Sequence, residues 1–179
     1  MEYATVFDLV STEFKKERLD YLLIGGFAIN SYGVTRQTMD VDFMITASDY
    51  PKALAVLKAH GYEEAYRQDV FSRLKSSRPE WMDVDFLFVD RQTLEPMVRD
   101  GKKVEISGHE FTVPSLDHLI ALKLHSLRYN PKIREYKDLL DILKLIQRNQ
   151  MDVRAEAFRN LCLKFGTEEI YRKILEKTE

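Results

Sequence analysis

The stretch Leu22–Ile45, LLIGGFAINSYGVTRQTMDVDFMI, decides the fold, because it joins two apolar runs through a glycine pair and a short polar segment. The second run carries two acidic residues, Asp40 and Asp42, between apolar neighbours. A carboxylate in the interior of a strand is costly unless a partner compensates its charge. The stretch therefore predicts a site at which a cation meets Asp40 and Asp42.

Length and composition indicate a globular protein. The 179 residues suggest one domain, or one domain with a helical appendage. Apolar residues make up 45% and charged residues 31% of the chain, so it can bury a core. The single cysteine, Cys162, excludes an internal disulfide and fits a reducing compartment. Without a signal-peptide pattern or an apolar run of about 20 residues, we expect a soluble cytoplasmic protein with no membrane partner.

Positive and negative charges are unevenly distributed, although the formal net charge is only −2. Residues 1–120 carry 14 Lys and Arg against 20 Asp and Glu, whereas residues 121–179 carry 13 against 9. This division is compatible with metal binding by the first part and polyanion binding by the last part. Ordinary solvated helix faces are the alternative explanation.

The first part of the chain reads as helices and strands in alternation. Expected helices cover 5–18, 27–33 and 48–61, the last with Ser48 as N-cap and Gly61 past its end. Expected strands cover 20–26, 39–45, 70–76 and 81–89, followed by a hairpin over 102–113. The strands that flank residues 77–80 should form an antiparallel pair.

After Pro114 the pattern becomes helical, with four stretches at residues 115–127, 134–147, 152–166 and 167–177. We therefore expect an α+β fold, in which a small mixed sheet flanked by helices precedes a helical bundle. The expected division is a core of residues 1–114 and a helical region of residues 115–179 packed on it.

The acidic residues form two similar strand patterns. Asp40 and Asp42 are two apart on one strand, so their side chains point to the same side, and Asp83 and Asp85 repeat the pattern. If the two strands are neighbours, one acid of the second strand completes a carboxylate triad. Such a triad can hold two divalent metal ions for displacement at phosphorus. The alternative is that these acids face solvent on an exposed sheet.

Gly25 and Gly26 end an apolar strand and open a helix. Glycine at such a position lets the backbone approach a phosphate, and a helix N-terminus offers free N–H groups. A tight strand-to-helix turn also needs glycine, so the pair alone is a weak signal.

The glycine pair, thirteen intervening residues and the D-V-D strand together resemble the signature of the DNA polymerase β-like nucleotidyltransferase superfamily. Within it, RQTMDVDF resembles the R-x-T-x-D-[IV]-D-[FL] pattern of AbiEii-like minimal nucleotidyltransferases. LIALKLHSL and REYKDLLDI resemble two later helices of those proteins, one with an apolar-flanked lysine and one with a K-D-x-x-D motif. The resemblance extends from about residue 5 to residue 146.

The resemblance implies roles for the acids. Asp40 and Asp42 would be metal ligands, and Asp85 the third carboxylate, which also helps to deprotonate the acceptor hydroxyl. Asp85 is preferred to Asp83 because VDFLF is the better match to the family's V-D-x-L strand. The expected ions are two Mg²⁺, with Mn²⁺ as a substitute.

The resemblance also implies a nucleotide site. Gly25 and Gly26 would touch the triphosphate, although many members have Gly-Ser where this chain has Gly-Gly. Lys123 would neutralise charge on the leaving phosphates. Asp138 would lie near the site and orient Lys123 or the acceptor.

Arg36 and Thr38 precede the first acidic strand and are candidates for nucleotide binding. Arg36 could contact a phosphate or the acceptor, or it could pair with a surface acid. Thr38 could contact a phosphate, or it could cap or stiffen the start of the strand.

The charged residues of the later helices have structural alternatives. Lys123 could be a snorkelling lysine on an apolar helix face. Asp138 and Asp141 could be exposed helix charges, or they could be partners for Arg134 and Lys137.

The expected function is metal-dependent transfer of an NMP from an NTP, ATP among them, to an acceptor hydroxyl with release of pyrophosphate. The resemblance suggests tRNA, another RNA or a protein as acceptor, and a toxin of a toxin–antitoxin or phage-defence pair with a cognate antitoxin. A small-molecule acceptor, as in antibiotic-modifying nucleotidyltransferases, is the same-fold alternative. A non-catalytic nucleotide- or partner-binding module and a plain RNA-binding domain are alternatives of another class.

Overall fold

The computed structural model describes residues 3–178, and for residues 133 and 135 it describes the backbone alone. The chain divides into two compact units. Unit 1 comprises the described residues up to Ala28 together with Gln37–Ser115, and unit 2 comprises Ile29–Arg36 and the described residues from Leu116 onward. Unit 1 holds the strands and unit 2 is helical, so the expected α+β class is confirmed.

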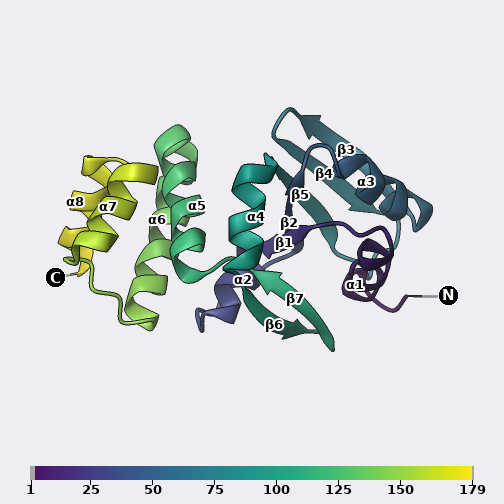
Figure 1. Ribbon diagram of the computed structural model, residues 1–179, viewed down its shortest axis with the longest axis horizontal. Helices are drawn as coiled ribbons and strands as arrows, with labels where there is room; N and C mark the ends of the chain where they lie inside the picture. Colours follow the sequence, from purple (N-terminus) through teal and green to yellow (C-terminus); the bar gives the residue numbers. More distant parts are fainter. Residues whose placement is uncertain (1–2, 179) are drawn as a thin grey trace. The chain divides into compact units, whose positions relative to one another are not determined.

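Unit 1 is built on a mixed sheet with the strand order β1-β2-β5-β4-β3 (Figure 1). Its strands are β1 (Tyr21–Ile24), β2 (Asp40–Thr46), β3 (Tyr62–Gln68), β4 (Phe71–Ser76) and β5 (Asp83–Val89). The acidic strands β2 and β5 are neighbours and run parallel, whereas the other neighbouring pairs are antiparallel. The expected antiparallel pair around residues 77–80 is confirmed by β4 and β5.

The remaining elements of unit 1 surround this sheet. They are α1 (Val6–Lys16), α3 (Tyr50–Ala59), α4 (Arg91–Arg99), and a hairpin of β6 (Lys102–Ile106) and β7 (His109–Val113). Helix α1 begins with a capping box, in which Thr5 and Asp8 satisfy each other's backbone N–H groups. The hairpin turns through Ser107 and Gly108, as the sequence predicts.

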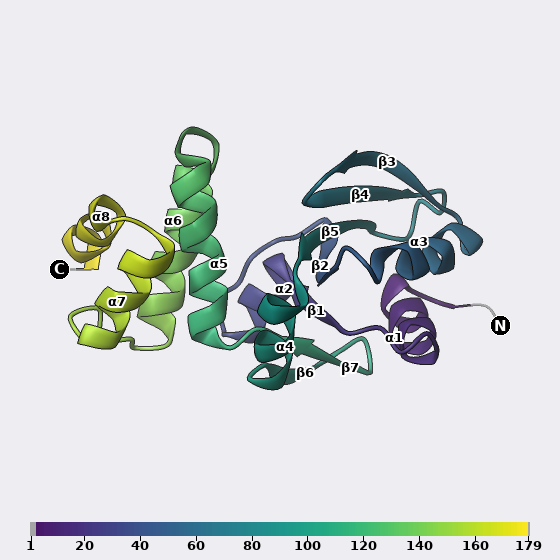
Figure 2. The same ribbon diagram turned by 45° about the horizontal axis from the view of Figure 1, so that its top comes forward.

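Helices α1 and α3 lie along one face of the sheet (Figure 2), and aromatic side chains form the core on that face. Phe43 of β2 and Phe86 of β5 are register partners with ring centroids 5.9 Å apart. Phe14 of α1 and Tyr50 of α3 pack on Phe86 at 6.4 and 5.3 Å. Because side chains alternate along a strand, the acids next to Phe43 and Phe86 point to the opposite face.

The structure contains two elements of unit 1 that the sequence analysis did not predict, and it corrects the predicted N-cap of α3. Strand β3 is a mostly exposed edge strand, so it lacks an apolar signal. Helix α4 contains Pro96, and a proline inside a segment argues against a helix in the sequence. Asp90 caps the start of this helix by accepting a hydrogen bond from the backbone N–H of Thr93. Asp49, not Ser48, takes the N-cap position of α3, where Thr46 hydrogen-bonds both Ser48 and Asp49.

Unit 2 consists mainly of α5 (Leu116–Tyr129), α6 (Pro131–Arg148), α7 (Glu156–Phe165) and α8 (Glu168–Thr178). These correspond to the helical stretches expected after Pro114. Their buried apolar side chains recur at helical spacing, as a bundle requires; examples are Leu124, Leu127, Ile142, Leu145, Phe158, Cys162, Tyr171 and Ile174. No helix in the described part of the chain has both the length and the apolar character needed to cross a bilayer.

The segment Ile29–Arg36 belongs to unit 2, although unit 1 residues precede and follow it. It contains the end of α2 (Gly25–Ser31), which begins in unit 1. The Asn30 amide closes the following turn by bonding both the N–H and the C=O of Arg36, and Gly33 adopts a φ of 78° there. Asn149, after α6, donates to the carbonyl of Tyr32 at 3.3 Å and fixes the turn to the helices.

Candidate active site

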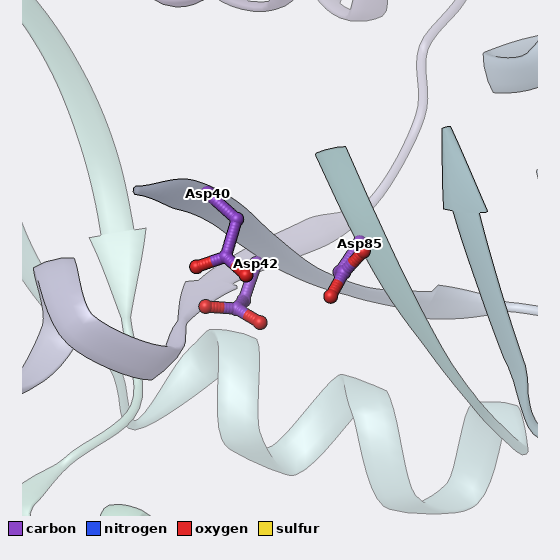
Figure 3. A group of neighbouring side chains, drawn as sticks. All are labelled: Asp40, Asp42 and Asp85. Atoms are coloured by element: carbon purple, nitrogen blue, oxygen red, sulfur yellow. The ribbon is translucent and has the colours of Figure 1, made fainter. Parts of the chain in front are cut away.

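Asp40, Asp42 and Asp85 lie together on the face of the sheet opposite the aromatic core (Figure 3). One carboxylate oxygen from each lies within 4.8 Å of the others. The parallel register places Asp42 directly opposite Asp85, and Asp40 lies on the same face of β2. The second acidic strand lies beside the first, which meets the condition that the sequence set for a triad.

Asp85 rather than Asp83 joins this carboxylate triad. Asp85 is 4% exposed, while Asp40 and Asp42 are half-buried. The carboxylate of Asp83 instead accepts a hydrogen bond from the backbone N–H of Ser76 at 3.1 Å. The triad therefore has one buried member and two members that solvent can reach.

Arg73, on β4, is the charged neighbour of the triad. It is the register partner of Asp85, and its Nε and Nη2 donate to the two oxygens of Asp85 at 2.8 and 2.5 Å. Its Nη2 also lies 3.6 Å from Oδ2 of Asp40. The hydrogen bonds to Asp85 raise the pKa of Arg73 above its usual value, so the guanidinium stays charged.

Sequence reasoning missed Arg73, because FSRLKS alone does not show which β5 residue lies opposite it. A basic residue on a strand predicted to pair with an acidic strand is the available signal, and it needs the β4–β5 register to become specific.

The glycine pair makes room for the triad's own side chains. A Cβ on Gly25 would lie 2.0 Å from Oδ2 of Asp42, and the φ of 65° at Gly25 also favours glycine. A Cβ on Gly26 would lie 2.6 Å from Cβ of Thr38. Both glycines are therefore needed for packing, whatever else they bind.

Thr38 supports Asp40, the first acid of the triad. Its hydroxyl donates to the backbone carbonyl of Asp40 at 3.0 Å, and it lies 3.2 Å from Oδ1 of the same residue. This geometry fits the interpretation that Thr38 stiffens the start of the strand, and it also orients the Asp40 carboxylate.

The donor set fits a hard divalent cation. Carboxylate oxygens are the ligands that Mg²⁺ and Mn²⁺ prefer, and they converge here from two adjacent strands. Three carboxylates that lie this close repel one another, and a bound cation would compensate their negative charge.

A second charge cluster lies within unit 2. The Nζ of Lys123, on α5, lies 2.7 Å from Asp138 and 2.9 Å from Asp141, both on α6. Arg36 forms an ion pair with the same Asp141. The two acids are 1% and 6% exposed, so the interpretation of Asp138 and Asp141 as exposed helix charges is wrong. Lys123 does not merely snorkel, because it holds both carboxylates.

The predicted site residues therefore fall into two sets, each defined within its own unit. Those of unit 1 surround the triad: Asp40, Asp42, Asp85, Gly25, Gly26 and Thr38. Those of unit 2 form the second cluster: Arg36, Lys123 and Asp138.

Unit 2 also carries a basic surface on α6. Among the residues of α6 whose side chains the structure describes, every exposed charged one is basic: Lys132, Arg134, Lys137, Lys144 and Arg148. An open hollow of about 440 Å³ lies between residues 33–35 and the end of this helix, with Lys144 and Arg148 in its lining. Tyr136, on the same helix, is 87% exposed.

A comparison with known families finds a match over almost the whole chain. The profile of a family described as "Uncharacterised nucleotidyltransferase" matches residues 4–178. No curated protein sequence matches the chain.

Solved structures share the fold at low sequence identity. The antibiotic-resistance factor ANT(2'')-Ia is 14% identical with a TM-score of 0.65, over 96% of this chain and 95% of that one. An antigenic nucleotidyltransferase-like protein from Paracoccidioides brasiliensis is 17% identical with a TM-score of 0.59, over 96% and 90%. A CCA-adding enzyme solved with CTP is 14% identical with a TM-score of 0.50, over 96% of this chain and 45% of that one.

Proposed function

The chain belongs to the uncharacterised nucleotidyltransferase family, and from this premise we propose that it moves an NMP from an NTP to an acceptor hydroxyl. The acceptor oxygen would bond to the α-phosphorus, and the bond from that phosphorus to the oxygen of the leaving pyrophosphate would break. The observation that carries the proposal is the convergence of Asp40, Asp42 and Asp85 on one face of the sheet.

The triad has two tasks in this proposal. Asp40, Asp42 and Asp85 would hold the divalent metal, two Mg²⁺ ions or Mn²⁺ in their place. When bound, such ions neutralise the triphosphate and favour the ionised form of the acceptor hydroxyl. Asp85 would accept the proton of that hydroxyl, and Thr38 would keep Asp40 in position through its hydrogen bonds.

Further residues would bind the nucleotide. The backbone of Gly25 and Gly26 would face the triphosphate, which adds to their packing role. Lys123 and Arg36 are the candidates for phosphate contact, and their ion pairs with Asp138 and Asp141 would set the direction of the two cationic groups. Asp138 is thus proposed as a positioning residue for Lys123.

RNA, including tRNA, is the acceptor that we propose. The support is the basic surface of α6 and its exposed Tyr136, because cations bind phosphodiesters and an aromatic ring can stack an unpaired base. A small-molecule acceptor is the alternative, supported by the likeness to an antibiotic-resistance factor. In the described part of the chain, we find no comparable surface feature that favours a protein acceptor.

The biological setting is a finer proposal. The resemblance of RQTMDVDF to AbiEii-like proteins supports a toxin role in a toxin–antitoxin or phage-defence pair, with a cognate antitoxin as partner. Co-purification of a neighbouring gene product that blocks NMP transfer would test this role directly.

One labelling experiment tests the reaction. The protein is incubated with each α-labelled NTP, Mg²⁺ and, in separate tubes, total RNA, protein lysate and a panel of aminoglycosides and lincosamides. We expect Mg²⁺-dependent label in RNA, and none with the Asp40→Asn, Asp42→Asn double variant.

The alternatives give different results in the same tubes. Label in an antibiotic supports the small-molecule acceptor. No label in any tube, together with no thermal shift from Mg²⁺ plus NTP, supports the non-catalytic module and overturns the proposal. RNA binding with a steep salt dependence but no need for Mg²⁺ or NTP indicates a plain RNA-binding domain.

A further inference from the structure

We propose that Arg73 is an internal counter-ion of the carboxylate triad, which competes with divalent metal for Asp85 and thereby sets the metal affinity of the site. The inference rests on the proposed function, because it assumes that the triad binds metal. It adds a residue that the family resemblance does not assign and a way in which the protein tunes its own metal occupancy.

The register of the sheet places Arg73 in this position. Asp85 is paired with Arg73 on one side and with Asp42 on the other, so the buried carboxylate lies between a cation and an anion. Both oxygens of Asp85 accept hydrogen bonds from the guanidinium, in the parallel fork that arginine forms with carboxylates. The same Nη2 lies 3.6 Å from Asp40, so one side chain reaches two of the three triad members.

A metal ion at the triad meets two obstacles from this arrangement. The donor atoms of Arg73 occupy favourable directions at both oxygens of Asp85, and each oxygen has a limited number of lone pairs. The guanidinium is also positive, so it repels a divalent cation bound to Asp40 and Asp85. Metal binding therefore requires Arg73 to give up at least part of its bonding.

Arg73 has the freedom to do so. Its side chain is 44% exposed, while the side chain of Asp85 is 6% exposed. The arginine can therefore turn toward solvent at little desolvation cost, whereas Asp85 stays in the sheet and needs a cation at all times. The metal-free and metal-bound states thus differ in which cation Asp85 faces.

Removal of Arg73 should have opposite effects on the two states. Without metal, three close carboxylates lose their guanidinium and repel one another, so the protein is destabilised. With metal, the competitor and its charge are gone, so binding becomes tighter. A residue with only a structural role would weaken both states, and a residue that only contacts NTP would change neither.

The test is a titration of the protein with Mn²⁺ and with Mg²⁺ in the absence of nucleotide. Calorimetry measures the metal Kd, and thermal unfolding measures the shift in Tm. For Arg73→Met we expect a lower Tm without metal, a metal Kd about tenfold lower than in the wild type, and a larger rise in Tm on metal addition. Arg91→Met is the matched control in unit 1, because Arg91 is a half-exposed arginine that pairs with Asp49 and Asp20 away from the triad. Its metal Kd should equal that of the wild type.

Arg73→Lys serves if Arg73→Met does not fold. Lysine keeps the charge but loses the fork, so it frees one oxygen of Asp85 and should lower the metal Kd less than methionine does. An unchanged or weaker metal affinity in both variants overturns the inference while leaving the proposed function intact. A wild-type protein that binds neither Mn²⁺ nor Mg²⁺ overturns the metal site of the proposed function, and the role of Arg73 with it.

Discussion

The carboxylate triad of unit 1 and the ion cluster of unit 2 are built from the same side-chain types but differ in charge balance. The triad brings three carboxylates together, and Arg73 pairs with Asp85 and Asp40 from the side. In the unit 2 cluster, Asp138 and Asp141 pair with Lys123 and Arg36, so the two acids face two basic groups. The first cluster is rich in carboxylates, whereas acids and basic groups are equal in number in the second.

The two clusters also differ in solvent exposure, since the triad is more accessible than the cluster of unit 2. Asp40 and Asp42 are half-buried and open to solvent, and Arg73 is exposed. Asp138 and Asp141 are buried, and the Lys123 side chain is only 14% exposed. An accessible cluster of carboxylates is typical of a ligand site, and a buried cluster of paired charges is typical of a structural one. The comparison predicts that mutations in the first cluster affect mainly activity, whereas mutations in the second lower stability in addition to disturbing the phosphate contact proposed for Lys123.

The largest expected effect is on catalysis in unit 1. Asp42→Asn should lower the rate of NMP transfer by about a thousandfold, equivalent to about 4 kcal/mol, because a metal ligand and its charge are lost. The Tm without metal should stay the same or rise, since carboxylate repulsion is reduced. Transfer of label from an α-labelled NTP measures the rate.

Asp83→Asn is the matched control, because Asp83 lies on the same strand as Asp85 but outside the triad. It should retain most of the activity. Equal losses in Asp42→Asn and Asp83→Asn would contradict the assignment of the site to the triad.

The next effect is on the stability of unit 2. Asp138→Ala should lower the free energy of unfolding by about 3 kcal/mol, because it removes one partner from a buried ion pair with Lys123. Urea denaturation gives the value. Asp138→Leu combined with Lys123→Met should recover part of the loss, since no unpaired charge remains.

Glu169→Ala is the control for this second prediction. Glu169 forms an exposed ion pair with Lys173 on α8, so its removal should leave stability within experimental error. If Asp138→Ala is equally mild, whatever its effect on the KM for NTP, then the buried ion pairs of unit 2 do not stabilise the fold and the contrast between the units fails.

A smaller effect is expected at the glycine next to the triad. Gly25→Ala should destabilise the protein by about 2 kcal/mol and reduce activity, because its Cβ would collide with the Asp42 carboxylate at a φ of 65°. Gly108→Ala has a similar φ of 78° but nothing within 4 Å of the added Cβ. It should cost only about 1 kcal/mol and leave activity unchanged, so the difference between the variants isolates the contact with Asp42.

The smallest expected effect uses Cys162 as a reporter of unit 2. Burial raises the pKa of this thiol to about 12, so at pH 8 it should react with iodoacetamide only after local opening. Asp138→Ala should speed the labelling about tenfold, as α7 packs on the helix that carries Lys123. Asp42→Asn should not change it, and equal acceleration by both variants would refute the separation of the two clusters.

The raised pKa of Cys162 also predicts how protein stability changes with pH. Because the pKa is higher in the folded protein, the unfolded thiol loses its proton first as the pH rises above about 9. The Cys162 contribution to stability should therefore be complete below pH 9 and decline toward pH 12. Urea denaturation at pH 8 and pH 10 should show a smaller decline for Cys162→Ala than for the wild type.

The core of the triad could be predicted because strand periodicity is local information. Alternation of two residues places Asp40 and Asp42 on one side, and the repeated pattern indicates that Asp83 or Asp85 joins them. The choice of Asp85 depended on resemblance, and the parallel register of β2 and β5 explains it physically. The helices of unit 2 were predictable for the same reason, since their apolar spacing is local.

The partners of the charged residues could not be predicted, because they are distant in sequence. Arg73 meets Asp85 through the register of two strands, and Lys123 meets Asp138 across two helices. Local rules suggested neighbours of Asp138 on its own helix, but tertiary packing buries it instead. Strand β3 was not predicted, because an exposed edge strand has no alternation of apolar and polar residues.

The path of the chain between its two units limits how the gene can be divided. The chain passes from unit 1 to unit 2 after Ala28, returns after Arg36 and leaves again after Ser115. A truncated chain that ends at Ser115 would thus leave Arg36 without Asp141, and the fragment from Leu116 onward would lack the turn that Asn149 holds. Neither part is a transferable module, and we expect that recombination between relatives at residue 115 yields chimaeras with mismatched interiors.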